Sequence, residues 1–231
     1  MLSELQNPEV LILPAPQIIA LDLDRTLGNV DACMVRFNSV AKSLGINTKE
    51  NEEKRAETES RGRSFDPYSF IPENLREEFD RHFLSADEPP ILYDDVNPFL
   101  AKLQQNNIPH LVVTYGVNPD WQKLKIAASG FKGNVVIIGH EDKGTEINSW
   151  RNPENQFALT DGDQRKILGR SVCLIDDKAK AFKSLPSGCS GFWLQREDAK
   201  PQKGEIILPP DVKIIHSLSE LTVAGKLLKL K

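Results

Sequence analysis

The stretch QIIALDLDRTLGN, residues 17–29, decides how the rest of the chain is interpreted. An apolar run from Ile18 to Leu21 leads directly into two aspartates, Asp22 and Asp24. Aspartate is a poor strand former and is rarely buried unless it is paired or bound to a metal. Two carboxylates at the end of a buried strand therefore indicate that other parts of the chain provide a partner for them.

Similar apolar runs recur along the chain and are typical of buried strands. They cover residues 18–24, 110–116, 134–140, 171–177, 190–195 and, more weakly, 212–217. The runs are continuous rather than alternating, so we expect both faces of the sheet to be covered.

Amphipathic stripes separate several of these runs and predict helices. One stripe follows Asp94 and Asp95, which are possible caps, and another is closed by Gly130; they consist of Val96, Phe99, Leu100 and Leu103, and of Trp121, Leu124 and Lys125. Strands that alternate with helices predict an α/β fold with a doubly wound, Rossmann-like parallel sheet. Ligands bind such sheets at the carboxyl ends of the strands, where the first two aspartates lie.

Residues 29–93 contain no strand-like run and are called the helical insert below. Two apolar stripes predict helices there, one closed by Gly45 and one opened by Pro72; they consist of Phe37, Val40, Ala41 and Leu44, and of Leu75, Phe79 and Phe83. The middle, residues 48–61, is nearly all charged and predicts a solvated helix. We expect a small helical domain at 29–93, inserted into a core formed by 1–28 and 94–231.

The segment RGRSFDPYSF, residues 61–70, mixes arginines with aromatic residues. It could line a ligand pocket, with Arg61, Arg63 and Tyr68 as contacts. It could equally be a loop in which Phe65 and Tyr68 pack on the insert. The sequence leaves both readings open.

A second acidic pair, Asp176 and Asp177, ends the apolar run SVCLI. Parallel strands bring both acidic pairs to one edge of the sheet, where the carboxylates would repel one another without a cation. Hard oxygen ligands of this kind suit Mg²⁺. The alternative is that each pair separately caps a helix.

These motifs resemble those of the haloacid dehalogenase (HAD) superfamily, which is dominated by Mg²⁺-dependent phosphatases. The first motif matches DLDRTL at Asp22, Asp24 and Thr26, the second matches Thr114 in HLVVTYG, and the fourth matches Asp176 and Asp177. The helical insert fits the type C1 cap of that family. Tyr115 departs from the pattern, since many relatives have a small polar residue there.

The third motif is a single lysine, for which Lys143 in EDKGTEI is our choice because it could open the helix after the run at 134–140. Lys123 is a weaker rival, and Lys166 and Lys178 are weaker still. Asp161 and Asp163 could mimic an acidic motif, but no strong apolar strand precedes them, so we expect a surface loop.

The resemblance implies a phosphomonoester hydrolase that acts on a small phosphorylated metabolite. Asp22 would be the nucleophile that forms an aspartyl-phosphate, and Asp24 the general acid and base. Thr114 and Lys143 would bind the phosphoryl group. The metal ligands would be Asp22, the main-chain carbonyl of Asp24, and Asp176, with Asp177 holding a metal-bound water or orienting Lys143.

Asp24 favours phosphoryl transfer over dehalogenation, because family dehalogenases lack a carboxylate at that position. A phosphotransferase or mutase, and a catalytically idle binding module, remain alternatives. A receiver domain of two-component signalling is disfavoured, because its acidic pair comes on the first strand. The substrate and the oligomeric state are not readable from the sequence.

The bulk composition is that of an ordinary globular protein, with 231 residues, 39% hydrophobic and 27% charged. A net charge of −4 and a pI near 5.7 do not suggest nucleic-acid binding. The N-terminus lacks a basic region, so it makes a poor signal peptide, and no apolar run reaches membrane-spanning length. Cys33, Cys173 and Cys189 have no metal-ligand spacing, so we expect buried, reduced thiols in a cytoplasmic protein.

Overall fold

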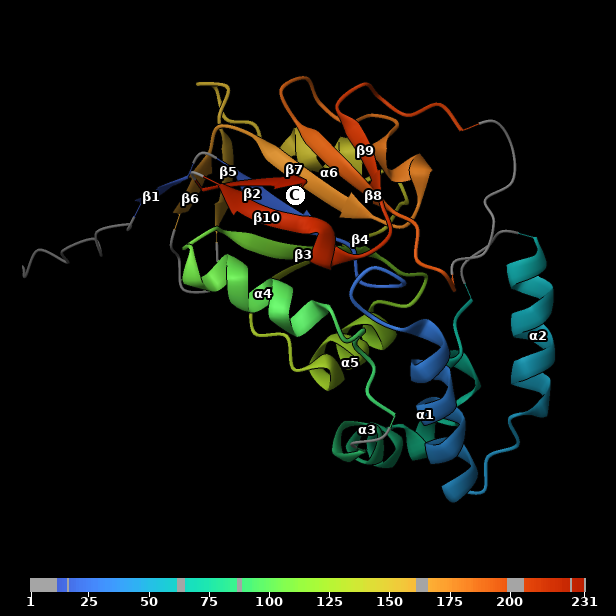
Figure 1. Ribbon diagram of the computed structural model, residues 1–231. Helices are drawn as coiled ribbons and strands as arrows, with labels where there is room; N and C mark the ends of the chain where they lie inside the picture. Colours follow the sequence, from blue (N-terminus) through green and yellow to red (C-terminus); the bar gives the residue numbers. More distant parts are fainter. Residues whose placement is uncertain are drawn as a thin grey trace, which may run out of the picture.

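A parallel sheet of six strands forms the centre of the protein (Figure 1). The computed structural model describes residues 12–15, 17–61, 65–86, 89–160, 166–198, 206–224 and 226–230. The strand order is β4-β3-β2-β7-β8-β9, and every neighbouring pair is parallel. The strands are β2 (Ile18–Leu21), β3 (His110–Tyr115), β4 (Asn134–Ile138), β7 (Val172–Asp176), β8 (Ser190–Leu194) and β9 (Val212–Ile215). They coincide with the apolar runs, so the predicted doubly wound α/β fold is confirmed.

Both faces of this sheet are buried, which explains why the runs are continuous. Alternate residues of β2 belong to two different cores, Ile19 and Leu21 to one and Ile18 and Ala20 to the other. The first core is closed by α4 (Val96–Gln105) and by the hairpin of β10 (Leu221–Ala224) and β11 (Leu227–Leu230). The second is closed by α6 (Lys143–Ser149) and a smaller sheet. Figure 1 shows α4 and β10 on one side of the central strands and α6 on the other.

The smaller sheet contains strands that the sequence analysis did not predict. Its order is β1-β6-β5, with β1 at Ile12–Ala15, β5 at Phe157–Thr160 and β6 at Lys166–Gly169. One of them, β5, is a short strand that ends directly before Asp161, and the surface loop expected at Asp161 and Asp163 stays a prediction. Asp161 and Asp163 themselves lie outside the described residues. Since β5 pairs with β6 and not with the central sheet, it does not extend the edge where the other acidic pairs lie.

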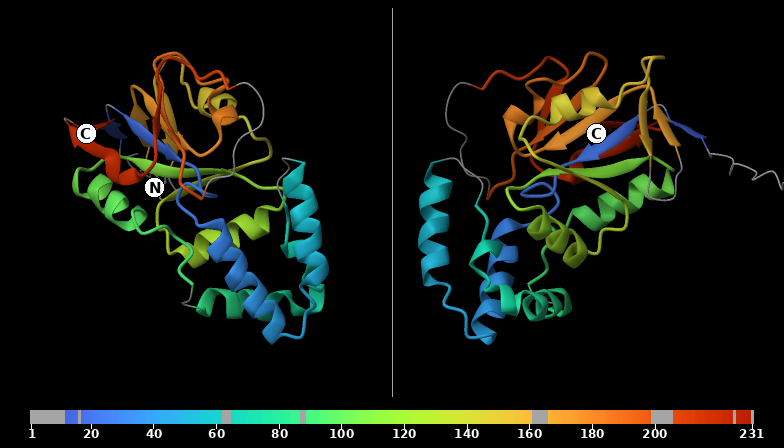
Figure 2. Two further views of the ribbon diagram at one scale, coloured as in Figure 1. Left: turned by 45° about the vertical axis from the view of Figure 1, so that its right-hand side comes forward. Right: turned by 180° about the vertical axis from the view of Figure 1, so that it is seen from behind.

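Helices make up the insert, as predicted. They are α1 (Val30–Ser43), α2 (Lys49–Ser60) and α3 (Arg76–Ser85), with short 3-10 turns at Tyr68–Phe70 and Glu73–Leu75. Helix α1 is followed by Gly45 at φ 75°, a conformation that favours glycine. Among the described residues of the insert, strand pairing is limited to an isolated bridge of Leu92 with Gly28. Both views of Figure 2 show α1 and α3 grouped beyond the central sheet, with α5 (Pro119–Ser129) beside them.

An aromatic cluster holds this group together. Its members are Phe37 of α1, Tyr68 of the first 3-10 turn, the α3 residues Phe79 and Phe83, and Trp121 of α5. The Phe37 and Trp121 rings meet edge to face at 5.5 Å, and the Tyr68 ring stacks on Trp121 at 6.2 Å. Because Trp121 belongs to the helix that follows β3, the insert leans on the core through α5.

Candidate active site

Three carboxylates converge where β2 and β7 end. Asp22 follows β2, Asp176 is the last residue of β7, and Asp177 follows it. The register pairs Leu21 with Ile175, which places Asp22 and Asp176 at the same level of adjacent strands. One carboxylate oxygen from each of the three residues lies within 4.8 Å of the others. The predicted meeting of the two acidic pairs at one edge of the sheet is therefore what the structure shows.

Lys143 reaches into this carboxylate cluster from the first residue of α6. Its Nζ donates to Oδ1 of Asp22 and to Oδ2 of Asp176. The side chain of Asp142 caps the helix by accepting from Thr145 N, so the expectation that Lys143 opens this helix is confirmed. Gly144 lets the start of α6 lie close to the backbone of Ser184, because a β carbon at this position would be only 2.3 Å from that backbone.

Two other lysines considered for this role, Lys123 and Lys178, are described and are placed differently. Lys123 is exposed and forms an ion pair with Asp120 on the surface of α5. Lys178 lies beside the cluster, where its backbone N–H donates to Oδ1 of Asp176 at 2.7 Å. The side chain of Lys166 is outside the described residues. Of the described candidates, Lys143 is the lysine whose ammonium group bonds two of the clustered carboxylates.

The cluster carries more negative charge than Lys143 balances. Burial, opposed by Lys143 and assisted by the neighbouring carboxylates Asp176 and Asp24, raises the pKa of Asp22 to about 6. Burial together with Asp176 and Asp22 raises the pKa of Asp177 well above its ordinary value. Burial alone would lower the pKa of Lys143, but Asp176 and Asp22 raise it on balance. Such a site favours an additional cation.

The donor set fits Mg²⁺, which prefers oxygen ligands and is usually held by a few carboxylates. Asp22, Asp176 and Asp177 provide these oxygens within one small region. The side chain of Asp24 is not part of this cluster, and the role of its main-chain carbonyl as a metal ligand stays a prediction.

Thr114 adds a buried hydroxyl at the end of β3, the strand on the other side of β2. Leu21 pairs with Val112, so Thr114 follows two residues later at the same edge of the sheet. Thr114 is completely buried, and its Oγ1 has no hydrogen-bond partner among the described residues. A buried hydroxyl without a protein partner points to a ligand that takes its hydrogen bond.

Asp24 is held by two side chains of α5 that the sequence analysis missed. Lys125 Nζ donates to both carboxylate oxygens at 2.5 and 2.6 Å, and Gln122 Nε2 donates to Oδ2 at 3.3 Å. Burial alone would raise the pKa of Asp24, but Lys125 and Gln122 lower it below its ordinary value. A signal was present, because Lys125 lies four residues after Trp121 in an apolar stripe. A lysine on a buried stripe needs an anionic partner.

Two of the predicted substrate contacts in the insert, Arg61 and Tyr68, are described, and their described partners lie within the insert and α5. Arg61 is exposed and pairs with Glu57 of α2. Tyr68 is buried; its hydroxyl donates to Asp80, and its ring packs on Trp121 and Phe79. Arg63 lies outside the described residues. Their contact with a substrate stays a prediction, and the contacts of Tyr68 favour the alternative reading, in which it packs on the insert.

No family model and no curated protein matches this sequence. Solved structures do match. One is a haloacid dehalogenase-like hydrolase from Burkholderia xenovorans LB400, with a TM-score of 0.57 and 16% identity, covering 90% of this chain and 95% of that one. Another is the HAD hydrolase YfnB from Bacillus subtilis, with a TM-score of 0.54 and 16% identity, covering 89% of this chain and 96% of that one.

The fold is that of the HAD hydrolases. This fold agrees with the resemblance of the sequence motifs to those of the HAD superfamily. The first, second and fourth motifs lie at the ends of β2, β3 and β7. The three cysteines are buried and form no disulfide among the described residues. Across the described part of the chain, none of the helices combines the length and apolar character that a membrane crossing requires.

Proposed function

We propose that the protein is a Mg²⁺-dependent phosphomonoester hydrolase that acts on a small phosphorylated metabolite. The observation that carries this proposal is the convergence of Asp22, Asp176, Asp177 and Lys143 at one edge of the sheet. The unpartnered hydroxyl of Thr114 at the same edge supports it. YfnB, which shares the fold, was solved with magnesium bound.

Mg²⁺ held by Asp22, Asp176 and the carbonyl of Asp24 would offset the negative charge of the phosphate oxygens. The Asp22 carboxylate attacks phosphorus while Asp24 gives a proton to the leaving oxygen, and the product is an aspartyl-phosphate. Water then hydrolyses this intermediate and passes a proton to Asp24. Thr114 donates a hydrogen bond to a phosphoryl oxygen, and Lys143 places a positive charge beside it.

We further propose that the helical insert, residues 29–93, serves as a cap over this site. Helices α1 and α3 of the insert pack on α5 through the aromatic cluster, and the chain enters the insert directly after the loop that carries Asp24. Closure of a cap excludes water from the transfer step and brings selecting side chains to the substrate.

A metabolite screen tests the proposed hydrolase. Phosphate release from a panel of phosphate esters is measured with Mg²⁺, with EDTA, and after Mg²⁺ is restored. We expect activity to disappear on chelation and to return with the metal, and the Asp22→Asn variant to stay inactive throughout. Full activity in thoroughly chelated protein contradicts the site. Transfer of phosphate to a sugar acceptor instead of water would indicate a phosphotransferase or mutase, and no turnover on any ester would indicate a binding module.

A further inference from the structure

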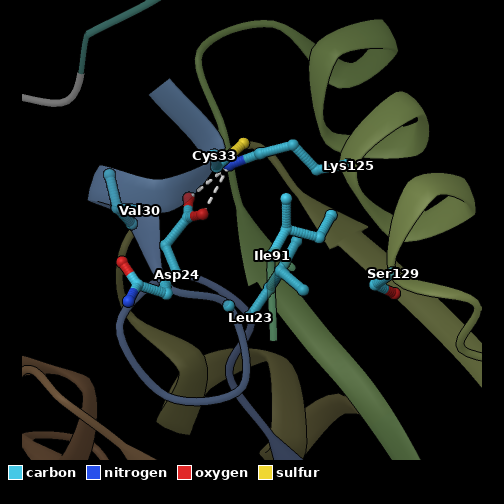
Figure 3. Close-up of a pocket in the computed structure, with 9 residues that line it drawn as sticks. Leu23, Asp24, Val30, Cys33, Ile91, Lys125 and Ser129 are labelled. Atoms are coloured by element: carbon cyan, nitrogen blue, oxygen red, sulfur yellow. Dashed lines mark hydrogen bonds and ion pairs between the residues drawn. The ribbon is translucent and has the colours of Figure 1, made fainter. Parts of the chain in front are cut away.

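A charged pair lies beside the carboxylate cluster and not within it. The Lys125 ammonium contacts both oxygens of Asp24, and the Lys125 side chain is 9% exposed. The adjoining cavity is lined by Leu23, Val30 and Ile91 (Figure 3), and by Asn29 and Ser129, whose side chains bond Ala32 N and the Ile126 carbonyl. Few other polar groups on this side are available to bond the Asp24 carboxylate, so its hydrogen bonds to Lys125 set its orientation.

The same helix supplies a second donor to Asp24. Gln122 lies three residues before Lys125 and so faces the same way on α5. Its Nε2 donates to Asp24 and also to the carbonyl oxygen of Tyr115 at 3.1 Å. Gly116 makes room for it, because a β carbon there would lie 2.3 Å from the Gln122 side chain. The two donors fix the carboxylate against rotation.

Helix α5 is itself fixed by the aromatic cluster. Trp121 and Leu124 are buried among the aromatic side chains of the insert, on the neighbouring face of the helix. Lys125 Nζ also lies 5.7 Å from the Trp121 ring, which adds a cation–π contact. The orientation of Asp24 is thus coupled to how the insert packs on the core.

We propose that Lys125, assisted by Gln122, is a positioning residue that holds Asp24 for proton transfer to the leaving group. This inference rests on the proposed hydrolase function. When the Asp22–phosphorus bond forms and the ester bond breaks, Asp24 passes to the leaving oxygen the proton that it took from water in the preceding turnover, and a carboxylate remains. The Lys125 ammonium, at hydrogen-bond distance, balances that new charge. In the second half, water bonds phosphorus, the Asp22–phosphorus bond breaks, and Asp24 takes the water proton.

Two aryl esters of similar shape provide the test. Phenyl phosphate has a poorer leaving group than p-nitrophenyl phosphate, so it depends more on a general acid. We expect Lys125→Met to lower the ratio of kcat/KM for phenyl over p-nitrophenyl phosphate by roughly tenfold, a part of what general acid catalysis contributes. Lys125→Arg, which keeps the charge and the donors, should restore most of the ratio. Lys123→Met, on the exposed face of the same helix, should leave it unchanged.

The ratio does not depend on how much of a variant is folded, because the same active fraction of the protein hydrolyses both esters and cancels in the ratio. In an Asp24→Asn background, Lys125→Met should not change the ratio further. An equal loss on both esters, or a ratio that rises, overturns the role of Lys125 while leaving the hydrolase intact. If the wild type with Mg²⁺ turns over neither ester nor acetyl phosphate, the proposed function fails and this inference fails with it.

Discussion

Lys143 and Lys125 show how one residue type serves two different carboxylates. Lys143 bonds Asp22 and Asp176 within the carboxylate cluster, whereas Lys125 bonds Asp24 from α5. Each ammonium is nearly buried, so each depends on its anionic partners. The two lysines are therefore expected to contribute to different steps of phosphoryl transfer, charge neutralisation for one and proton transfer for the other.

Replacing Lys143 by alanine is expected to lower turnover on the order of a hundredfold or more, as the loss of an oxyanion donor does. The reason is that its ammonium is the cation that bonds two of the clustered carboxylates. Lys123→Ala, which removes only a surface ion pair, is the control and should cost little. Steady-state kinetics with Mg²⁺ measure both variants, and the reverse order would move the third motif to Lys123.

The sequence motifs predicted the residues of the carboxylate cluster, because an acidic pair that directly follows a buried strand needs a cation or a hydrogen-bond donor beside it. Lys143 could be chosen because it followed a strand and could open a helix. The apolar stripe indicated that Lys125 needs an anionic partner, but that this partner is Asp24 becomes visible only once α5 is placed against the loop after β2. A contact between residues about a hundred positions apart depends on packing, which a local pattern does not contain.

At the scale of elements, the inner strands of the central sheet, β2, β3, β7 and β8, were predictable because they are buried on both faces. The strands of the smaller sheet and the β10–β11 hairpin were not. Length is not the reason, because β2 and β9 are also four residues long, but β1 contains Pro14, which is uncommon in strands. Their pairing partners, not their own composition, make them strands.

Helix α3 offers a matched pair of substitutions for the aromatic cluster. Phe83 is fully buried against Phe79 and Trp121, whereas the neighbouring Leu84 is 47% exposed. We expect Phe83→Ala to lower the free energy of unfolding by about 3–5 kcal/mol, through lost burial and the cavity it leaves. Leu84→Ala should cost less than about 1 kcal/mol. Urea denaturation measures both, and equal costs would mean that the cluster does not stabilise the insert.

At the scale of the whole molecule, the carboxylate cluster links metal binding to stability and pH. Burial raises the pKa of Asp22 from 3.8 to about 6, so the folded protein holds this proton more tightly than the unfolded chain does. The contribution of Asp22 to stability without metal therefore falls as the pH rises from 3.8 towards 6. Mg²⁺ has to displace this proton, so metal binding strengthens over the same range.

We accordingly expect Mg²⁺ to raise the Tm by several degrees near pH 7.5, and by less than about half as much near pH 5. Thermal unfolding with and without saturating Mg²⁺ at the two pH values gives the shifts. Asp177→Asn removes one of the clustered carboxylates and should lose most of the shift at the higher pH. A shift of the same size at both pH values would show that the metal does not compete with the proton on Asp22.

The position of β7 next to β2 has a consequence for how the protein is made. Asp176, on the strand beside Asp22, follows it by 154 residues in the sequence (176 − 22), so it leaves the ribosome well after Asp22 does. At about 5–20 residues per second, this delay lasts on the order of ten seconds. During that time β2 has an open edge and Asp22 lacks both Asp176 and Lys143 as neighbours. Until β7 is made, a nascent chain therefore cannot use a metal held by Asp22 and Asp176 to stabilise itself, and the edge of β2 that will pair with β7 stays open.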